Sequence, residues 1–188
     1  MIKLDMDGVV ADFFTAALRW HGGMPYLSGW PRGISCDGKT GDDIARVLGL
    51  TNEEFYAPLM LRDFWDDIKP YPGAPEFVES LREVGTVKIY TVITGDHDVC
   101  MEAKRNWCSD YLHIYGGDVI FCTSCQDKVQ RVGQRGVLID DHPITCEGVR
   151  RAGGRALLVP RPWNSRDPAL RFDRVDYRRV LQMLEDLL

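Results

Sequence analysis

Short apolar runs alternate with segments of helical periodicity along most of this chain. The runs, several of them rich in β-branched residues, lie at 2–4, 87–90, 119–122, 137–139 and 156–159. Between the second and third runs, Val99, Ala103 and Trp107 recur at a spacing of four, which gives a helix one apolar face. Similar patterns, typical of helices, precede the second run and close the chain. This alternation indicates an α/β fold, in which a parallel sheet is covered by helices.

The alternation is interrupted after the first run. Residues 14–69 contain no good strand pattern, and helical segments are predicted at 42–48 and 51–60. The second segment starts with Thr51 and Glu54, which have the spacing of a capping box. We therefore expect a core domain of residues 1–13 and 70–188, with residues 14–69 inserted as a small helical cap. The aromatic residues of this region, most of which we expect in the cap's own core, are Trp20, Tyr26, Trp30, Phe55, Tyr56, Phe64 and Trp65.

The charge balance limits the classes of partner. The 188 residues include 23 Lys and Arg against 28 Asp and Glu, a formal net charge of −5, and the pI is near 5.4. A general nucleic-acid binder normally has a basic face, so we expect no nucleic-acid polymer as partner. No apolar run approaches the ~20 residues of a membrane span. The N-terminus reaches Asp5 without an apolar stretch of signal-peptide length, so we expect a cytoplasmic protein without a membrane partner.

The cysteines do not assemble a convincing metal site. Cys122 and Cys125 are separated by two residues, but no second pair completes a four-ligand zinc site. Because a cytoplasmic compartment is reducing, we expect free thiols. The six residues concerned are Cys36, Cys100, Cys108, Cys122, Cys125 and Cys146.

Acidic pairs follow two of the predicted strands. Asp5 and Asp7 come directly after the first strand and precede Gly8, and Asp140 and Asp141 follow the fourth. In open α/β sheets the ligand sites lie at the carboxyl ends of the strands. Carboxylates gathered there repel one another unless a cation or a proton is shared. Oxygen ligands of this kind suit Mg²⁺, so the sequence predicts a magnesium site.

A lysine and a hydroxyl group are placed to assist such a site. Lys128 precedes the second acidic pair by about a dozen residues and could clamp a substrate phosphate. At the end of the second strand, Thr91 and Thr94 compete as the hydroxyl that would bind a phosphate oxygen.

Together these motifs resemble those of the haloacid dehalogenase (HAD)-like phosphohydrolase superfamily. The features on which this resemblance rests are the segment DMDGVVADF at 5–13, a strand-end threonine, a downstream lysine and LIDDHP at 138–143. Within the superfamily the chain resembles the 5′(3′)-deoxyribonucleotidase family. That closer resemblance rests on three segments, which are Ala11-Asp12-Phe13, Lys104-Arg105-Asn106-Trp107 and Arg161-Pro162-Trp163-Asn164. It implies a Rossmann-like parallel sheet as the HAD core, with a small helical cap inserted after the first strand.

The resemblance implies a role for each motif residue. Asp5 would attack phosphorus and form an aspartyl-phosphate, while Asp7 would protonate the leaving oxygen and later activate water. The ligands of Mg²⁺ would be Asp5, the backbone carbonyl of Asp7, and Asp141, with Asp140 in a supporting role. Thr91, which fits the family's spacing better than Thr94, would bind the phosphate with the backbone of Val92 and with Lys128. Val92 and Ile93 depart from the small or polar residues that many members have there.

The cap would select the leaving group. Phe13 is the first candidate for stacking on a base, followed by Trp65 and Trp30. The resemblance thus implies a Mg²⁺-dependent 5′-nucleotidase acting on (deoxy)ribonucleoside monophosphates. Two alternatives remain, which are a phosphatase for another small phosphomonoester such as a sugar phosphate, and a non-catalytic phosphate-binding protein. The preferred base and sugar, the 5′ or 3′ position of the phosphate, and the choice between monomer and homodimer all stay open.

Overall fold

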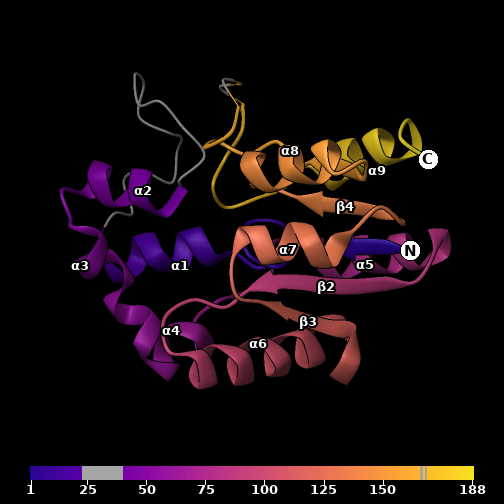
Figure 1. Ribbon diagram of the computed structural model, residues 1–188. Coiled ribbons are helices and arrows are strands. Elements are labelled where there is room, and N and C mark those ends of the chain that lie inside the picture. The colour runs from indigo at the N-terminus through magenta and orange to yellow at the C-terminus, as the bar shows by residue number, and fades with distance from the viewer. Residues whose placement is uncertain (23–39, 166, 168) are drawn as a thin grey trace.

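The computed structural model describes residues 1–22, 40–165, 167 and 169–188. Across these residues one parallel sheet forms, with the strand order β3-β2-β1-β4-β5 (Figure 1). Its strands are β1 (Ile2–Leu4), β2 (Val87–Val92), β3 (Val119–Cys122), β4 (Val137–Asp140) and β5 (Arg155–Leu158). All the predicted strands are confirmed. Because β2 and β4 run slightly further than predicted, Thr91 and Asp140 are the last or next-to-last residues of strands.

Helices cover both faces of the sheet (Figure 1). On one face lie α7 (Cys125–Val132) and α8 (Pro143–Arg151), and on the other lie α5 (Ala74–Val84), α6 (His97–Leu112) and α9 (Tyr177–Glu185). The side chains of Asp96, Ser124 and Asp176 accept hydrogen bonds from first-turn N–H groups and so begin α6, α7 and α9. Gly85 ends α5 as predicted, and the short 3₁₀ helix η3 (Gly116–Asp118) precedes β3.

Alternate residues of each strand face opposite layers. On β1, Ile2 and Leu4 are buried in the apolar core below α5 and α6. Lys3 points the other way and is also buried, and its ammonium donates to the carbonyls of Val132 and Arg135. These carbonyls lie at and beyond the C-terminal end of α7, so a charge in the sheet holds that end of the helix in place.

The described part of the cap is helical, as predicted. It consists of α1 (Phe13–Trp20), α2 (Thr40–Leu48), α3 (Asn52–Tyr56), the 3₁₀ helix η2 (Ala57–Met60) and α4 (Arg62–Asp66). Thr51 and Glu54 form the predicted capping box. The predicted α-helix over 51–60 was too long, because it ends at Tyr56 and continues as η2. Pro58 has no N–H to donate to the preceding turn, which prevents the α-helix from continuing.

The cap packs around its own aromatic residues. Phe55, Phe64 and Trp65 are buried, which confirms the prediction for them, whereas Trp20 at the end of α1 is 41% exposed. The described cysteines, Cys100, Cys108, Cys122, Cys125 and Cys146, are free. Tyr26, Trp30 and Cys36 lie outside the described residues.

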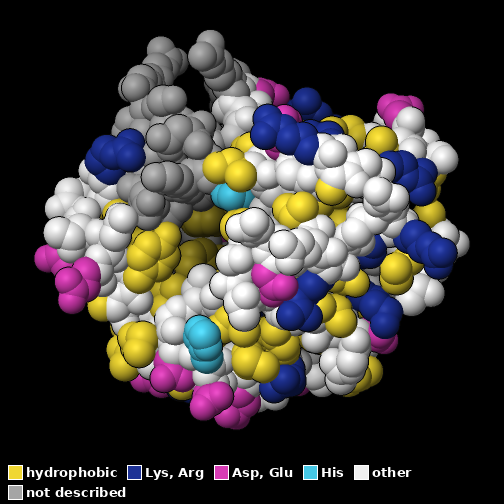
Figure 2. Space-filling view, viewed as in Figure 1, with side chains coloured by type: hydrophobic (Ala, Val, Ile, Leu, Met, Phe, Trp, Pro, Cys, Tyr) yellow, Lys and Arg dark blue, Asp and Glu magenta, His cyan; other side chains and the backbone are white. Residues whose placement is uncertain are grey.

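The cap lies beside the carboxyl ends of the strands, whereas both chain termini lie at the opposite end of the sheet (Figure 1). On the face shown in Figure 2, hydrophobic side chains gather between the cap helices and α7. Among the described helices, none has the length and apolar character needed to cross a membrane. The fold therefore brings the predicted motif residues and the cap to the same edge of the sheet.

Candidate active site

A tight loop after β1 carries the first acidic pair. The Asp5 N–H donates to the Ile139 carbonyl at 2.9 Å, which extends the pairing of β1 with β4. The chain then turns back, and the Met6 carbonyl accepts from the Ala11 N–H at 2.9 Å. As a result Asp5 lies beside β4 and α7, while the side chain of Asp7 reaches a residue of α6.

Gly8 closes this loop against the second acidic pair. Its φ of +79° lies in the left-handed region that favours glycine. A Cβ at this position would lie only 2.5 Å from Oδ2 of Asp141. The glycine that follows the two aspartates is therefore required both by the backbone conformation and by the close approach of Asp141.

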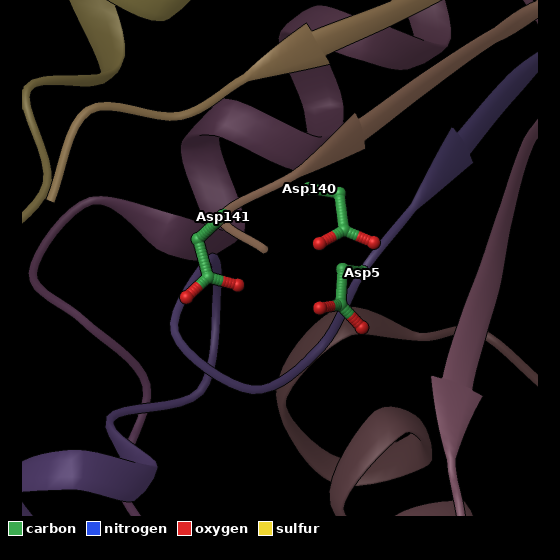
Figure 3. Close-up of side chains that lie close together, drawn as sticks. All are labelled: Asp5, Asp140 and Asp141. Carbon is green, nitrogen blue, oxygen red and sulfur yellow. The ribbon is translucent and has the colours of Figure 1, made fainter. Parts of the chain in front are cut away.

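Three carboxyl groups from two neighbouring strands meet at this edge (Figure 3). Asp5, Asp140 and Asp141 each offer an oxygen, and these oxygens lie within 4.8 Å of one another. The three residues are 8%, 0% and 4% exposed. The structure thus brings together three of the four acidic residues that the sequence placed at this edge, while the side chain of the fourth, Asp7, contacts a lysine of α6.

Lys128 contacts two of these acids from α7. Its Nζ lies 2.6 Å from Oδ1 of Asp5 and 2.7 Å from Oδ2 of Asp140. Burial favours a lower pKa for this lysine, but the attraction of Asp140 and Asp5 outweighs it and raises the pKa above its ordinary value. Lys128 therefore remains charged beside the predicted nucleophile.

Asp141 is oriented by residues that follow β5. The indole N–H of Trp163 donates to its Oδ2 at 2.7 Å, and the side-chain amide of Asn164 donates to its backbone carbonyl at 2.7 Å. Asn164 in turn accepts from the Arg161 N–H at 2.9 Å. The sequence singled out these three residues only for their resemblance to the family, and the structure shows that Trp163 and Asn164 contact Asp141.

A second buried lysine, which the sequence did not predict for the site, contacts Asp7. Lys104 lies on α6, and its Nζ is 2.5 Å from Oδ2 of Asp7. The same ammonium donates to Oγ1 of Thr91 and to the Val92 carbonyl, both at 2.8 Å. A signal was available, because Lys104 is four residues from Cys100 on the buried face of its helix. A lysine on an apolar helix face requires a buried partner.

Of the two candidate hydroxyl groups, Thr91 contacts the site lysine. Thr91 is fully buried on β2 and accepts from Lys104, which leaves its own O–H available as a donor. Thr94 lies in the loop between β2 and α6. The Val92 carbonyl is engaged by Lys104.

The two aromatic residues predicted to stack on a base are largely covered. Phe13 and Trp65 are 7% and 3% exposed. Phe13 packs edge-on against Phe64, with the ring centroids 5.5 Å apart. The Lys104 ammonium lies over the Trp65 ring, with Nζ 5.3 Å from the ring centroid.

The charges at the carboxyl cluster are unbalanced. The ammonium of Lys128 contacts Asp5 and Asp140, whereas Asp141 accepts from the uncharged indole of Trp163. Burial and then the charge of Asp140 raise the pKa of Asp141 to about 7, and the same two causes raise the pKa of Asp5 well above its ordinary value. Such acids bind either protons or a cation. Buried carboxylate oxygens are hard ligands, so the residues present fit a divalent cation such as Mg²⁺.

Comparisons with known proteins identify the fold and the family. The structure is similar to the haloacid dehalogenase-like hydrolase SP0104 from Streptococcus pneumoniae, with a TM-score of 0.59, 14% identity and 97% of each chain covered. It is also similar to the putative HAD-hydrolase YfnB from Bacillus subtilis, a structure with bound magnesium, with a TM-score of 0.54, 15% identity and 97% of each chain covered. A HAD-superfamily hydrolase of subfamily IA from Geobacter sulfurreducens gives a TM-score of 0.52 and 17% identity over 97% of this chain and 95% of that one. At these identities the likeness establishes the fold.

The family follows from the sequence comparison. A search among curated proteins gave no match. Residues 1–184 match the family described as 5′ nucleotidase, deoxy (Pyrimidine), cytosolic type C protein, which covers all but the last four residues. The chain therefore belongs to this family of 5′-nucleotidases, and it is a phosphoric monoester hydrolase with a HAD-like fold.

Proposed function

We propose that this protein hydrolyses nucleoside monophosphates with Mg²⁺, through a phosphorylated Asp5. The observation that carries the proposal is the environment of Asp5, which lies between the Lys128 ammonium and the carboxylate of Asp141. Its Oδ1 accepts from Lys128 and, at 2.8 Å, from the Met6 N–H. We assign the attack on phosphorus to the other oxygen, Oδ2.

The chain's own residues account for both chemical steps. In the first, a bond forms between Asp5 and phosphorus, the bond from phosphorus to the ester oxygen breaks, and Asp7 gives its proton to that oxygen. In the second, Asp7 takes a proton from water while the water oxygen attacks phosphorus, which releases phosphate and regenerates Asp5. Lys128 and the O–H of Thr91 stabilise the negative charge on the transferring group.

Asp5, Asp140, Asp141 and the backbone carbonyl of Asp7 would hold the metal. When bound, Mg²⁺ supplies positive charge that screens the repulsion between Asp5 and the phosphate. Trp163 and Asn164 keep Asp141 in the orientation that this role requires.

A nucleoside leaving group is supported by the family, whose description names a deoxynucleotide class. That description also names a cytosolic type, which supports a cytoplasmic location. Specificity for deoxyribose would need an apolar wall at the position of a 2′-hydroxyl.

The proposal is tested by phosphate release from a panel of monophosphates with Mg²⁺ or with EDTA. The panel contains 5′ and 3′ deoxynucleotides, the matching ribonucleotides and a sugar phosphate. We expect nucleotide hydrolysis with Mg²⁺ and a loss of at least ~100-fold with EDTA. Preference for the sugar phosphate would favour the alternative phosphatase, and no turnover of any compound would favour a phosphate-binding protein.

Magnesium is expected to stabilise the protein more at high pH. The folded-state pKa of Asp141 is about 7 against an ordinary value of 3.8, so the metal-free folded protein holds protons that the unfolded chain has lost. This stabilisation is complete below the ordinary pKa and is lost as the pH rises through the folded-state value. Because Mg²⁺ replaces those protons, it should raise the Tm by roughly 5 °C or more at about pH 8, and by less than half as much at about pH 5.5.

Differential scanning calorimetry with Mg²⁺ and with EDTA at the two pH values measures this difference. An Asp141→Asn variant serves as the control, because it should lose most of the gain at the higher pH. An equal or larger Mg²⁺ effect at the lower pH would contradict the placement of the metal at these acids.

A further inference from the structure

All the hydrogen-bond donors of the Lys104 ammonium have protein acceptors. Its side chain is fully buried, and its ammonium contacts three oxygen atoms, which belong to Asp7, Thr91 and Val92. A lysine ammonium has three N–H donors, so each has a protein acceptor. The donors of Lys104 therefore all serve the protein and not the phosphate.

Lys104 and Lys128 serve different aspartates from opposite faces of the sheet. Lys128 comes from α7 and contacts Asp5, whereas Lys104 comes from α6 and contacts Asp7. Two of the three Lys104 partners belong to β2, within the sheet. These two contacts anchor the ammonium to a rigid element, and the third directs it at Asp7.

Lys104 thus holds one oxygen of the Asp7 carboxyl group, and the other oxygen is unpaired within the part of the chain that the structure describes. Its Oδ2 is 2.5 Å from the Lys104 Nζ, while its Oδ1 is buried and has no hydrogen-bond partner among the described residues. The cap adds a second restraint, because the Trp65 ring lies 5.3 Å from the same ammonium. At this distance a cation and an aromatic face attract each other.

We propose that Lys104 is a positioning residue, which fixes the Asp7 carboxyl group so that Oδ1 faces the leaving oxygen. This inference rests on the proposed function, in which Asp7 passes a proton to the oxygen of the nucleoside. Lys104 itself touches neither phosphate nor leaving group. Without it, Asp7 rotates freely, and proton transfer to a poor leaving group slows.

The test compares two leaving groups. A nucleoside alkoxide needs a proton to depart, whereas p-nitrophenolate does not. The value of kcat/KM reports the steps up to and including the first irreversible one, which here is loss of the leaving group. The ratio of kcat/KM for dUMP to that for p-nitrophenyl phosphate therefore isolates the proton transfer to the leaving group. Lys104→Met should lower this ratio by at least ~10-fold, and Lys104→Gln, which keeps a shorter donor, should lower it less. For p-nitrophenyl phosphate, kcat should fall while kcat/KM changes little, because Asp7 also activates water.

Lys3→Met is the matched control, since it removes another buried lysine, whose ammonium contacts the carbonyls of Val132 and Arg135 and not Asp7. It should leave the ratio unchanged. A double-mutant cycle adds a second readout, because Lys104→Met should cost less than ~3-fold in an Asp7→Asn background if it acts through Asp7. An unchanged ratio in both Lys104 variants, or a full cost in the Asp7→Asn background, overturns the proposal. The Asp5→Asn variant separates the two questions, because turnover that survives there contradicts the proposed function and not the role of Lys104.

Discussion

An Asp5→Asn variant is expected to release phosphate from nucleoside monophosphates at least ~10³-fold more slowly than the unchanged protein. Asparagine has nearly the shape of aspartate, but its amide oxygen does not form an acyl phosphate. It also offers a weaker ligand to the metal. The measurement is phosphate release with saturating Mg²⁺, accompanied by denaturation of the reacting enzyme to recover the phosphorylated chain, which should be absent in the variant.

The variant should remain folded. The substitution removes one of three clustered carboxyl groups, while Lys128 keeps its contact with Asp140 at 2.7 Å. In EDTA its Tm should therefore be no lower than that of the unchanged protein. Asp110→Asn, an exposed position on α6, is the matched control and should keep full activity. Activity of Asp5→Asn within ~10-fold of the control would exclude Asp5 as the nucleophile.

Gly8→Ala is expected to have the second largest effect, and to act on both stability and metal binding. The backbone φ of +79° disfavours any residue with a Cβ, and that Cβ would lie 2.5 Å from Oδ2 and 2.8 Å from Cγ of Asp141. Either the loop or Asp141 must move. We expect a loss of about 2–4 kcal/mol in the free energy of unfolding and a fall of at least ~100-fold in kcat/KM.

Gly49→Ala separates the two causes. Gly49 has a similar φ of +70°, but nothing lies within 4 Å of the added Cβ. This control should lose only about 1 kcal/mol in its free energy of unfolding and keep its activity. Calorimetric titration with Mg²⁺ should show weaker binding for Gly8→Ala than for Gly49→Ala. Equal Mg²⁺ affinity in the two variants would show that Asp141 is undisturbed. It would contradict the explanation that the added Cβ of Gly8→Ala displaces Asp141.

The strands and most helix ends were predictable because their signals are local. Runs such as 119–122 fit a buried strand, and Thr51 with Glu54 begins a helix through contacts within one turn. The exception was also local in cause, since Pro58 ends α3 before the predicted position. The acidic pairs were predictable for another reason, because the carboxyl ends of parallel strands meet at one edge.

The partners of the two buried lysines were not predictable from the pattern. Lys128 was assigned to a substrate phosphate, and the structure shows it against Asp5 and Asp140. Lys104 was noticed only as part of a family segment, although it contacts Asp7. Which face of the sheet each helix covers depends on strand order, and no local pattern contains that order.

The position of each acidic pair at a strand end therefore follows from the order of residues along the chain, because short-range geometry brings Asp5 and Asp7 to the end of β1 and Asp140 and Asp141 to the end of β4. The division of labour between the lysines depends on the assembled sheet. Asp5 is joined to α7 and Asp7 to α6 because the loop after β1 passes between the two helix layers. Contacts between residues about a hundred positions apart, such as Lys104 with Asp7, exist only once packing has set both layers in place.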